Sequence, residues 1–256
     1  MRHGAFITEI DLFDNAAFGV GVAESSTMDP QQRLLLSHGY SALHGGGLTR
    51  SMLMEANVGV LVGIMSNEFS SALEFSNAYA MTGTGHCFAS GRLSFMLGMQ
   101  GECATFDTAC SSALVAFNSG RRSIQAGDVD VGALVAGVNL VFLPAQAYAY
   151  AAASLTSAAG ASKVFDARAD GFVRGEGVGA GFLSAEAALS EPAACGGAVR
   201  QDGKSASLTA PNGKAQQRLM QAVLAGSTAT ATEPTLVESA SNGSYCAYAS
   251  GGSCAP

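Results

Sequence analysis

Two patterns of apolar residues alternate along this chain. Stretches with apolar residues three or four positions apart predict helices, whereas short uninterrupted runs rich in β-branched residues predict buried strands. The predicted helices cover residues 31–43, 83–99, 110–126 and 214–224. The predicted strands cover residues 57–65, 102–107 and 131–139, with further extended segments over 171–184 and 198–208. Such alternation indicates an α/β fold with a mostly parallel sheet covered by helices.

Residues 131–162 carry no charge and are numerous enough to span a bilayer. The centre of this segment holds Asn139, Pro144 and Gln146, however, and its second half is rich in Ala, Ser and Tyr. Its first part has the pattern of a buried parallel strand. We therefore favour a strand over a membrane span.

A glycine-rich run at 175–181 is similar in composition to a dinucleotide-binding loop. No strand–helix unit followed by an acidic residue supports that interpretation. Glycine-rich strand turns explain the run better, and no cofactor is predicted.

The composition indicates a large domain with little charge. At 256 residues the chain can bury a sizeable core, but only 13% of its residues are charged, against roughly 25% in typical soluble domains. With 48% apolar residues and a mean hydropathy of +0.25, we expect a second copy or another protein to cover part of the surface. The net charge of −7 argues against nucleic acid as a partner, and we interpret the adjacent Arg121 and Arg122 as part of a solvated helix face.

The six cysteines include no C-x-x-C pair and no His/Cys cluster with zinc spacing, which argues against a metal site. The first residues lack the pattern of a secretory leader. We therefore expect reduced thiols in an intracellular compartment, cytoplasmic by default, with a plastid as the alternative. Cys246 and Cys254 could pair with each other, and their spacing leaves that open.

One of these cysteines, Cys110, lies where a predicted strand ends and a predicted helix begins. The first turn of a helix presents unpaired N–H groups and a partial positive charge, which favour a thiolate at that place. Cys110 is therefore a candidate nucleophile, and the alternative is an inert, buried cysteine.

Four segments of the chain, in order, resemble signature segments of the β-ketoacyl synthase (ketosynthase) domain of type I polyketide synthases. They are MDPQQRLLL at 28–36, DTACSSAL at 107–114, FDARADGFVRGEG at 165–177 and LTAPNG at 208–213. A fifth segment, GHCFASGRLS at 85–94, is similar to microalgal, dinoflagellate-type members of the family. The resemblance extends from about residue 4 to about residue 222.

The resemblance implies a thiolase-like α/β/α/β/α sandwich, of which this chain holds mostly the N-terminal half. It also implies that Cys110 accepts an acyl group from a carrier-protein thioester and that malonyl thioester is the second substrate. Members of the family are homodimers in which the strand before the nucleophile, here 103–107, pairs across the two-fold axis. A homodimer or a larger protein assembly is therefore expected.

The chain departs from the family pattern at both ends. We expect a truncated start, because the family's first strand precedes the segment that matches His3–Phe6. The first catalytic histidine of the family lies in a V-E-A-H-G-T-G-T segment, and the best match here, VESASNGS at 237–244, has Ala240 at that position. The second histidine would lie beyond Pro256. All four histidines of this chain precede Cys110.

These observations leave three hypotheses. The first is an acyl-transferring ketosynthase of polyketide or fatty-acid assembly, impaired in condensation. The second is a non-catalytic, ketosynthase-derived scaffold within a larger complex, that is, a pseudoenzyme. The third is an incomplete copy of a full-length enzyme. In each, residues 1–225 are expected to form the partial ketosynthase domain and residues 226–256 a diverged tail rich in Ala, Ser and Gly.

Overall fold

The computed structural model describes residues 3–73, 77–163, 166–186, 192–207 and 210–227, together with two short strand pieces farther on. The strands are β1 (Val58–Ile64), β2 (Cys103–Phe106), β3 (Gly132–Asn139), β4 (Gly177–Ser184), β5 (Ala240–Ser241) and β6 (Cys246–Ala247). The helices are α1 (Val22–Ser25), α2 (Pro30–Gly45), α3 (Arg50–Leu53), α4 (Glu68–Ala72), α5 (Ala80–Thr84), α6 (Cys87–Leu97), α7 (Ser112–Ala126), α8 (Pro144–Ala152) and α9 (Gly213–Ala225), with a 3₁₀ turn at Ala109–Ser111. The chain divides into two units, one made of Ala5–Pro144 and Gly175–Leu189 and the other of the remaining residues.

A four-stranded sheet in the order β2-β1-β3-β4 forms the centre of the first unit. Strand β1 lies between β2 and β3 and pairs in parallel with both. Strand β4 pairs antiparallel with β3. In this register Gly63 lies opposite Phe106 on one side and Gly137 on the other. The carboxyl ends of the three parallel strands therefore meet at one edge of the sheet.

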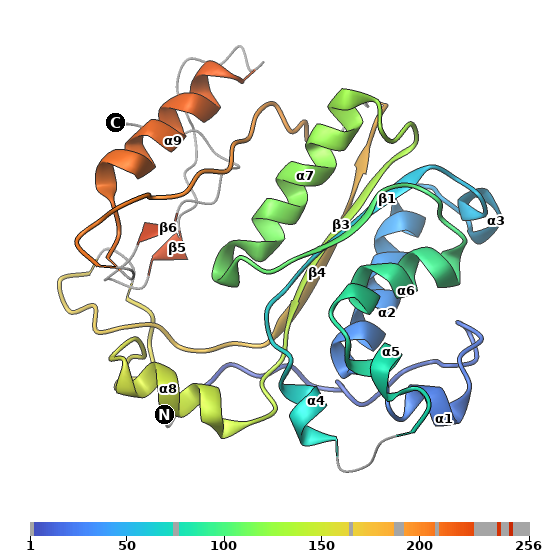
Figure 1. Ribbon diagram of the computed structural model, residues 1–256, viewed down its shortest axis with the longest axis horizontal. Coiled ribbons are helices and arrows are strands. Elements are labelled where there is room, and N and C mark those ends of the chain that lie inside the picture. The colour runs from blue at the N-terminus through green and yellow to red at the C-terminus, as the bar shows by residue number, and fades with distance from the viewer. Residues whose placement is uncertain are drawn as a thin grey trace. The chain divides into compact units, whose positions relative to one another are not determined.

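Successive side chains of β1 belong to different clusters on the two faces of this sheet. Each face has its own helices (Figure 1). On one face Val60 and Val62 of β1 join a buried cluster with Leu35 of α2 and Leu93 of α6. On the opposite face Leu61 packs in a second cluster beneath α7. The first unit thus has a helix–sheet–helix arrangement, as expected for a mostly parallel sheet.

Helix α2 begins with strong local signals. Pro30 occupies its first turn, and the Asp29 carboxylate caps it by accepting a hydrogen bond from the Gln31 N–H at 2.8 Å. Burial raises the pKa of Asp29 above its ordinary value, and the bonds from Gln31 offset this only in part. The cap fixes the start of α2 close to the sheet.

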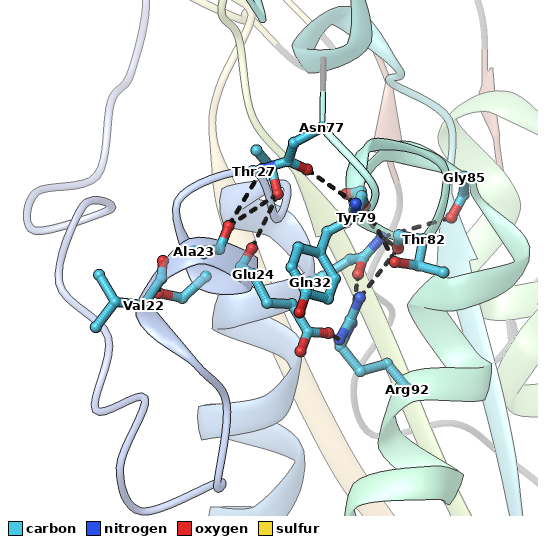
Figure 2. Close-up of polar contacts among 12 residues, drawn as sticks. Val22, Ala23, Glu24, Thr27, Gln32, Asn77, Tyr79, Thr82, Gly85 and Arg92 are labelled. Atoms are coloured by element: carbon cyan, nitrogen blue, oxygen red, sulfur yellow. Dashed lines mark hydrogen bonds and ion pairs between the residues drawn. The ribbon is translucent and has the colours of Figure 1, made fainter. Parts of the chain in front are cut away.

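A buried polar network links α1, α2, α5 and α6 (Figure 2). Arg92, whose side chain is 6% exposed, forms an ion pair with Glu24 of α1. Its Nε donates to Gln32 Oε1 at 2.8 Å, and its Nη2 donates to the carbonyl of Thr82 at 3.1 Å. Gln32 Nε2 in turn donates to the carbonyl of Gly83 at 3.0 Å. The network supplies the partners that a buried guanidinium requires.

The second unit is held by contacts around α8 and α9. The Arg174 guanidinium lies 5.2 Å from the centre of the Tyr150 ring and donates to Gln146 Oε1 at 3.2 Å. Asn212 caps α9 by accepting from the N–H of Ala215 at 3.3 Å. Elsewhere in this unit Asp170 accepts from Lys163 and Ser157, which lowers its pKa to about 2.

Most predicted elements are confirmed, and two details differ. The single helix predicted over 83–99 is two helices, because the chain is extended at Gly85 (ψ 132°) between α5 and α6. Residues 198–207 of the extended segment predicted over 198–208 pair with no strand among the described residues, and residue 208 lies outside them. The sheet is mostly parallel, as predicted, and β4 is its one antiparallel strand among the described residues.

The structure shows which elements residues 131–162 and the glycine-rich run at 175–181 contain. Residues 131–162 are divided between β3 and the short helix α8, and the glycine-rich run belongs largely to β4. Among the residues that the structure describes, no helix has both the length and the apolar character needed to cross a membrane.

The polar network leads to a prediction about stability. Replacing Glu24→Ala leaves the Arg92 guanidinium buried without its carboxylate partner, so we expect the free energy of unfolding to fall by about 1–3 kcal/mol. Urea denaturation followed by circular dichroism measures this loss. Glu24→Gln, which keeps an acceptor oxygen, should lose less. An unchanged unfolding midpoint for Glu24→Ala would contradict the role of the network.

Candidate active site at the start of helix α7

The candidate nucleophile lies in a tight turn between β2 and α7. Cys110 is the middle residue of the 3₁₀ turn Ala109–Ser111, and it is exposed. Ala109, directly before it, has a φ of +56°, in the left-handed region. A residue with a Cβ costs on the order of 1–2 kcal/mol in this conformation. The surrounding contacts must therefore hold the turn in place.

Short polar side chains supply those contacts. The carboxylate of Asp107 accepts from the N–H of Ala109 at 3.1 Å. The Ser112 hydroxyl accepts from the N–H of Thr108 at 2.8 Å and donates to the carbonyl of Ala109 at 2.6 Å. The Ser111 hydroxyl donates to the carbonyl of Thr108 at 2.9 Å. The residues on both sides of Cys110 are thus bonded to their neighbours.

Helix α7 starts close to the sheet because two strands carry glycine beneath it. A Cβ on Gly63 of β1 would lie 2.4 Å from the nitrogen of Ala113. A Cβ on Gly137 of β3 would lie 2.6 Å from the Cβ of Ala113. Side chains at either position would push the first turn of α7, and Cys110 with it, away from the sheet. Sequence reasoning missed these two residues, although glycine inside a β-branched strand signals such a close approach.

The histidines of the chain do not complete this site. His86, at the start of α6, lies with its Nε2 3.3 Å from the carbonyl of Ser66. His38 and His44 belong to α2, and His3 belongs to the second unit. Within the described part of the chain, no hydrogen bond joins any of the four to Cys110.

The structure describes only some of the other cysteines and of the remaining predicted site positions. Cys87 and Cys103 are exposed, and Cys195 is half-buried. Ala240 lies in β5, but its side chain is outside the described residues, as are the side chains of Cys246 and Cys254. The disulfide alternative therefore stays untested, as does the predicted boundary after residue 225.

Two family models match the chain in succession. The model described as the N-terminal domain of β-ketoacyl synthase matches residues 1–188, and that of the C-terminal domain matches residues 193–247.

Curated relatives are polyketide synthases. A phenolphthiocerol synthesis polyketide synthase of type I from Mycobacterium bovis is 39% identical over 250 residues, which cover 93% of this chain and 12% of the relative. The non-reducing polyketide synthase nvfA of Aspergillus novofumigatus is 38% identical over 250 residues, covering 94% of this chain and 11% of that protein. The chain thus spans a small part of these relatives. Because they are bacterial and fungal, the microalgal likeness stays a prediction.

Solved ketosynthases have the same fold. The ketosynthase from module 6 of the bacillaene synthase of Bacillus subtilis 168 superimposes with a TM-score of 0.74 at 35% sequence identity. The match covers 83% of this chain and 38% of that one.

The geometry of the turn leads to a prediction about reactivity. Cys87, Cys103 and Cys110 are all exposed, and Cys87 is the first residue of α6, but only Cys110 lies in a tight turn with a left-handed residue, Ala109, directly before it. We expect iodoacetamide to modify Cys110 at least about tenfold faster than the other two, as measured by time-resolved peptide mapping. A Cys254→Ser variant controls for competition from that cysteine. Equal rates for the three exposed thiols would contradict the prediction.

Proposed function

The chain belongs to the β-ketoacyl synthase family, with its thiolase-like fold, and we propose that its Cys110 accepts an acyl group from a thioester in polyketide or fatty-acid assembly. The observation that carries this proposal is the exposed cysteine in a held, left-handed turn before α7. A scaffold without chemistry has no need for such a turn. The natural donor by family is an acyl carrier protein thioester.

The proposed step is a transfer between two thiols. The Sγ of Cys110 attacks the carbonyl carbon of the donor thioester, and a new carbon–sulfur bond forms as the donor's carbon–sulfur bond breaks. The proton of the Cys110 thiol ends on the leaving thiol. The exchange is balanced without any change of oxidation state.

Condensation requires more than this transfer. A malonyl thioester loses carbon dioxide, and the resulting enolate attacks the acyl carbon, which releases the Cys110 thiolate. During the loss of carbon dioxide, negative charge develops on the oxygen of the malonyl thioester, and the family uses two histidines to stabilise this charge. Loss of one such preorganised donor slows a reaction by roughly a hundred- to a thousand-fold. With Ala240 at the position of the first histidine, we propose that this chain is impaired in condensation.

Ala240 at the first histidine position also favours a second candidate function. A chain with Ala240 in place of the first histidine could serve as a scaffold that retains the ketosynthase surface but forms no carbon–carbon bond. The low charge content of 13% agrees with a surface that a partner covers. The two candidates differ in one result, namely whether an acyl group arrives on Cys110.

A second copy of the chain is the proposed structural partner. Strand β2 is at the end of the sheet and pairs only with β1 among the described strands. Strand edges with free N–H and C=O groups invite pairing with another strand. Phe95, on the helix that packs against β2, is 79% exposed. We propose that β2 and α6 pack against the same elements of a second copy.

The acyl-transfer proposal is tested with hexanoyl and malonyl thioesters. We expect a hexanoyl adduct on Cys110 by peptide mass, and no β-ketoacyl product above the level of a Cys110→Ala control. Condensation at on the order of one turnover per second would contradict the proposed impairment. Folded protein without any adduct would contradict acyl transfer and favour the scaffold.

The dimer proposal is tested by placing a charged side chain on the exposed face of α6. Phe95→Glu should weaken self-association at least about tenfold, because a carboxylate would be buried at the interface. Light scattering over a concentration series measures the association. Leu12→Glu, at a 63% exposed position outside β2 and α6, is the matched control. A monomeric wild-type chain, or equal effects of both substitutions, would contradict this proposal.

A further inference from the structure

Three loops leave the sheet at the edge where Cys110 lies. Phe106, Gly63 and Gly137 stand side by side on β2, β1 and β3. Cys110 comes four residues after Phe106, Glu68 comes five residues after Gly63, and the segment Leu140–Leu143 begins three residues after Gly137. Because the strands are parallel, these three places share one edge of the sheet.

The segment Leu140–Leu143, which connects β3 to α8, is held in an unusual way. Its four successive N–H groups all donate to side chains and not to other backbone groups. The acceptors are Gln31 Oε1 for Leu140 (3.2 Å), Glu176 Oε1 for Val141 (2.9 Å), and Glu68 Oε2 for both Phe142 (2.8 Å) and Leu143 (2.7 Å).

Burying these acceptor side chains costs hydration free energy. Glu68 is 6% exposed and Gln31 is fully buried, and a buried carboxylate must gain strong hydrogen bonds to offset its lost hydration. Gln31 also donates to the carbonyl of Ser66 at 2.9 Å, so that one side chain joins the loop after β1 to the loop after β3. Hydrogen bonds to these two buried side chains therefore hold Leu140–Leu143 against the loop after β1.

The anchored segment is apolar. Val141, Phe142 and Leu143 are half-buried, and the Phe142 ring packs at 5.6 Å from that of Phe69 in α4. A partly exposed apolar segment, at the same edge of the sheet as the proposed acyl acceptor Cys110, matches the chemistry of an alkyl chain.

We infer that Glu68 is a positioning residue for acyl transfer: it fixes Leu140–Leu143 as the apolar wall along which the alkyl part of an acyl thioester is aligned toward Cys110. This inference rests on the proposed acyl transfer. Glu68 acts through the backbone of Phe142 and Leu143. Its loss should therefore slow attack on a long-chain thioester more than attack on a small reagent.

The test compares two rates at Cys110 in wild type, Glu68→Ala and Glu68→Gln. One rate is acylation by hexanoyl-N-acetylcysteamine, and the other is alkylation by iodoacetamide, which needs no alignment of a chain. For Glu68→Ala we expect acylation to slow at least about tenfold while alkylation changes less than about threefold. Glu68→Gln keeps an oxygen that accepts both N–H groups, and it should restore acylation to within about threefold of wild type.

Circular dichroism confirms folding of each variant, and Glu24→Ala is the matched control, because it removes a partly buried carboxylate without touching the segment. If Glu68→Ala does not fold, Glu68→Asp, which keeps the charge but is too short to reach both N–H groups, replaces it with the same expectation. Unchanged acylation, equal slowing of both rates, or a Glu24→Ala variant as slow as Glu68→Ala would overturn the inference. The wild-type acylation rate reports separately on the proposed function.

Discussion

The main chain of α7 lies so close to the sheet that only glycine fits beneath its first turn. Gly63 and Gly137, on neighbouring strands, together leave the space that Ala113 occupies. Because Cys110 is three residues before Ala113, this approach sets the position of the candidate nucleophile. The left-handed Ala109 and the hydroxyls of Ser111 and Ser112 then shape the turn that contains Cys110.

The remainder of the first unit supports this edge from the other side. Helices α2 and α6 cover the face opposite α7, and the ion pair between Arg92 and Glu24 ties them to α1. From the start of α2, Gln31 reaches the loops that follow β1 and β3. The same helix thus contributes both to the core and to the polar anchoring of the loops beside Cys110.

Local pattern was sufficient for most elements but not for their tertiary details. The β-branched runs and the spacing of Ala89, Leu93 and Leu97 predicted β1, β3 and most of α6, because burial on one face leaves a periodic trace in the sequence. The antiparallel direction of β4 leaves no such trace. Residues 198–207 of the predicted extended segment pair with no strand among the described residues, because local composition alone does not supply a pairing partner.

The site was predictable only where chemistry is concentrated in one short motif. DTACSSAL identified Cys110 through family resemblance, and its strand–helix junction agreed with the expected setting of a nucleophile. The left-handed Ala109 and the acceptors Gln31, Glu68 and Glu176 are distant in sequence or depend on backbone conformation. Such features follow from the packing of three loops and carry no local signal.

The measurement that bears most directly on this account is the acyl occupancy of Cys110 in two glycine variants of the same strand. Gly63→Ala places a methyl group on the backbone of α7, whereas Gly59→Ala meets only side chains, at 3.3 Å or more. Intact mass after incubation with hexanoyl thioester should show at least about a tenfold slower adduct in Gly63→Ala, with Gly59→Ala close to wild type. Equal adduct formation in both variants would contradict the claim that the approach of α7 to the sheet positions the nucleophile.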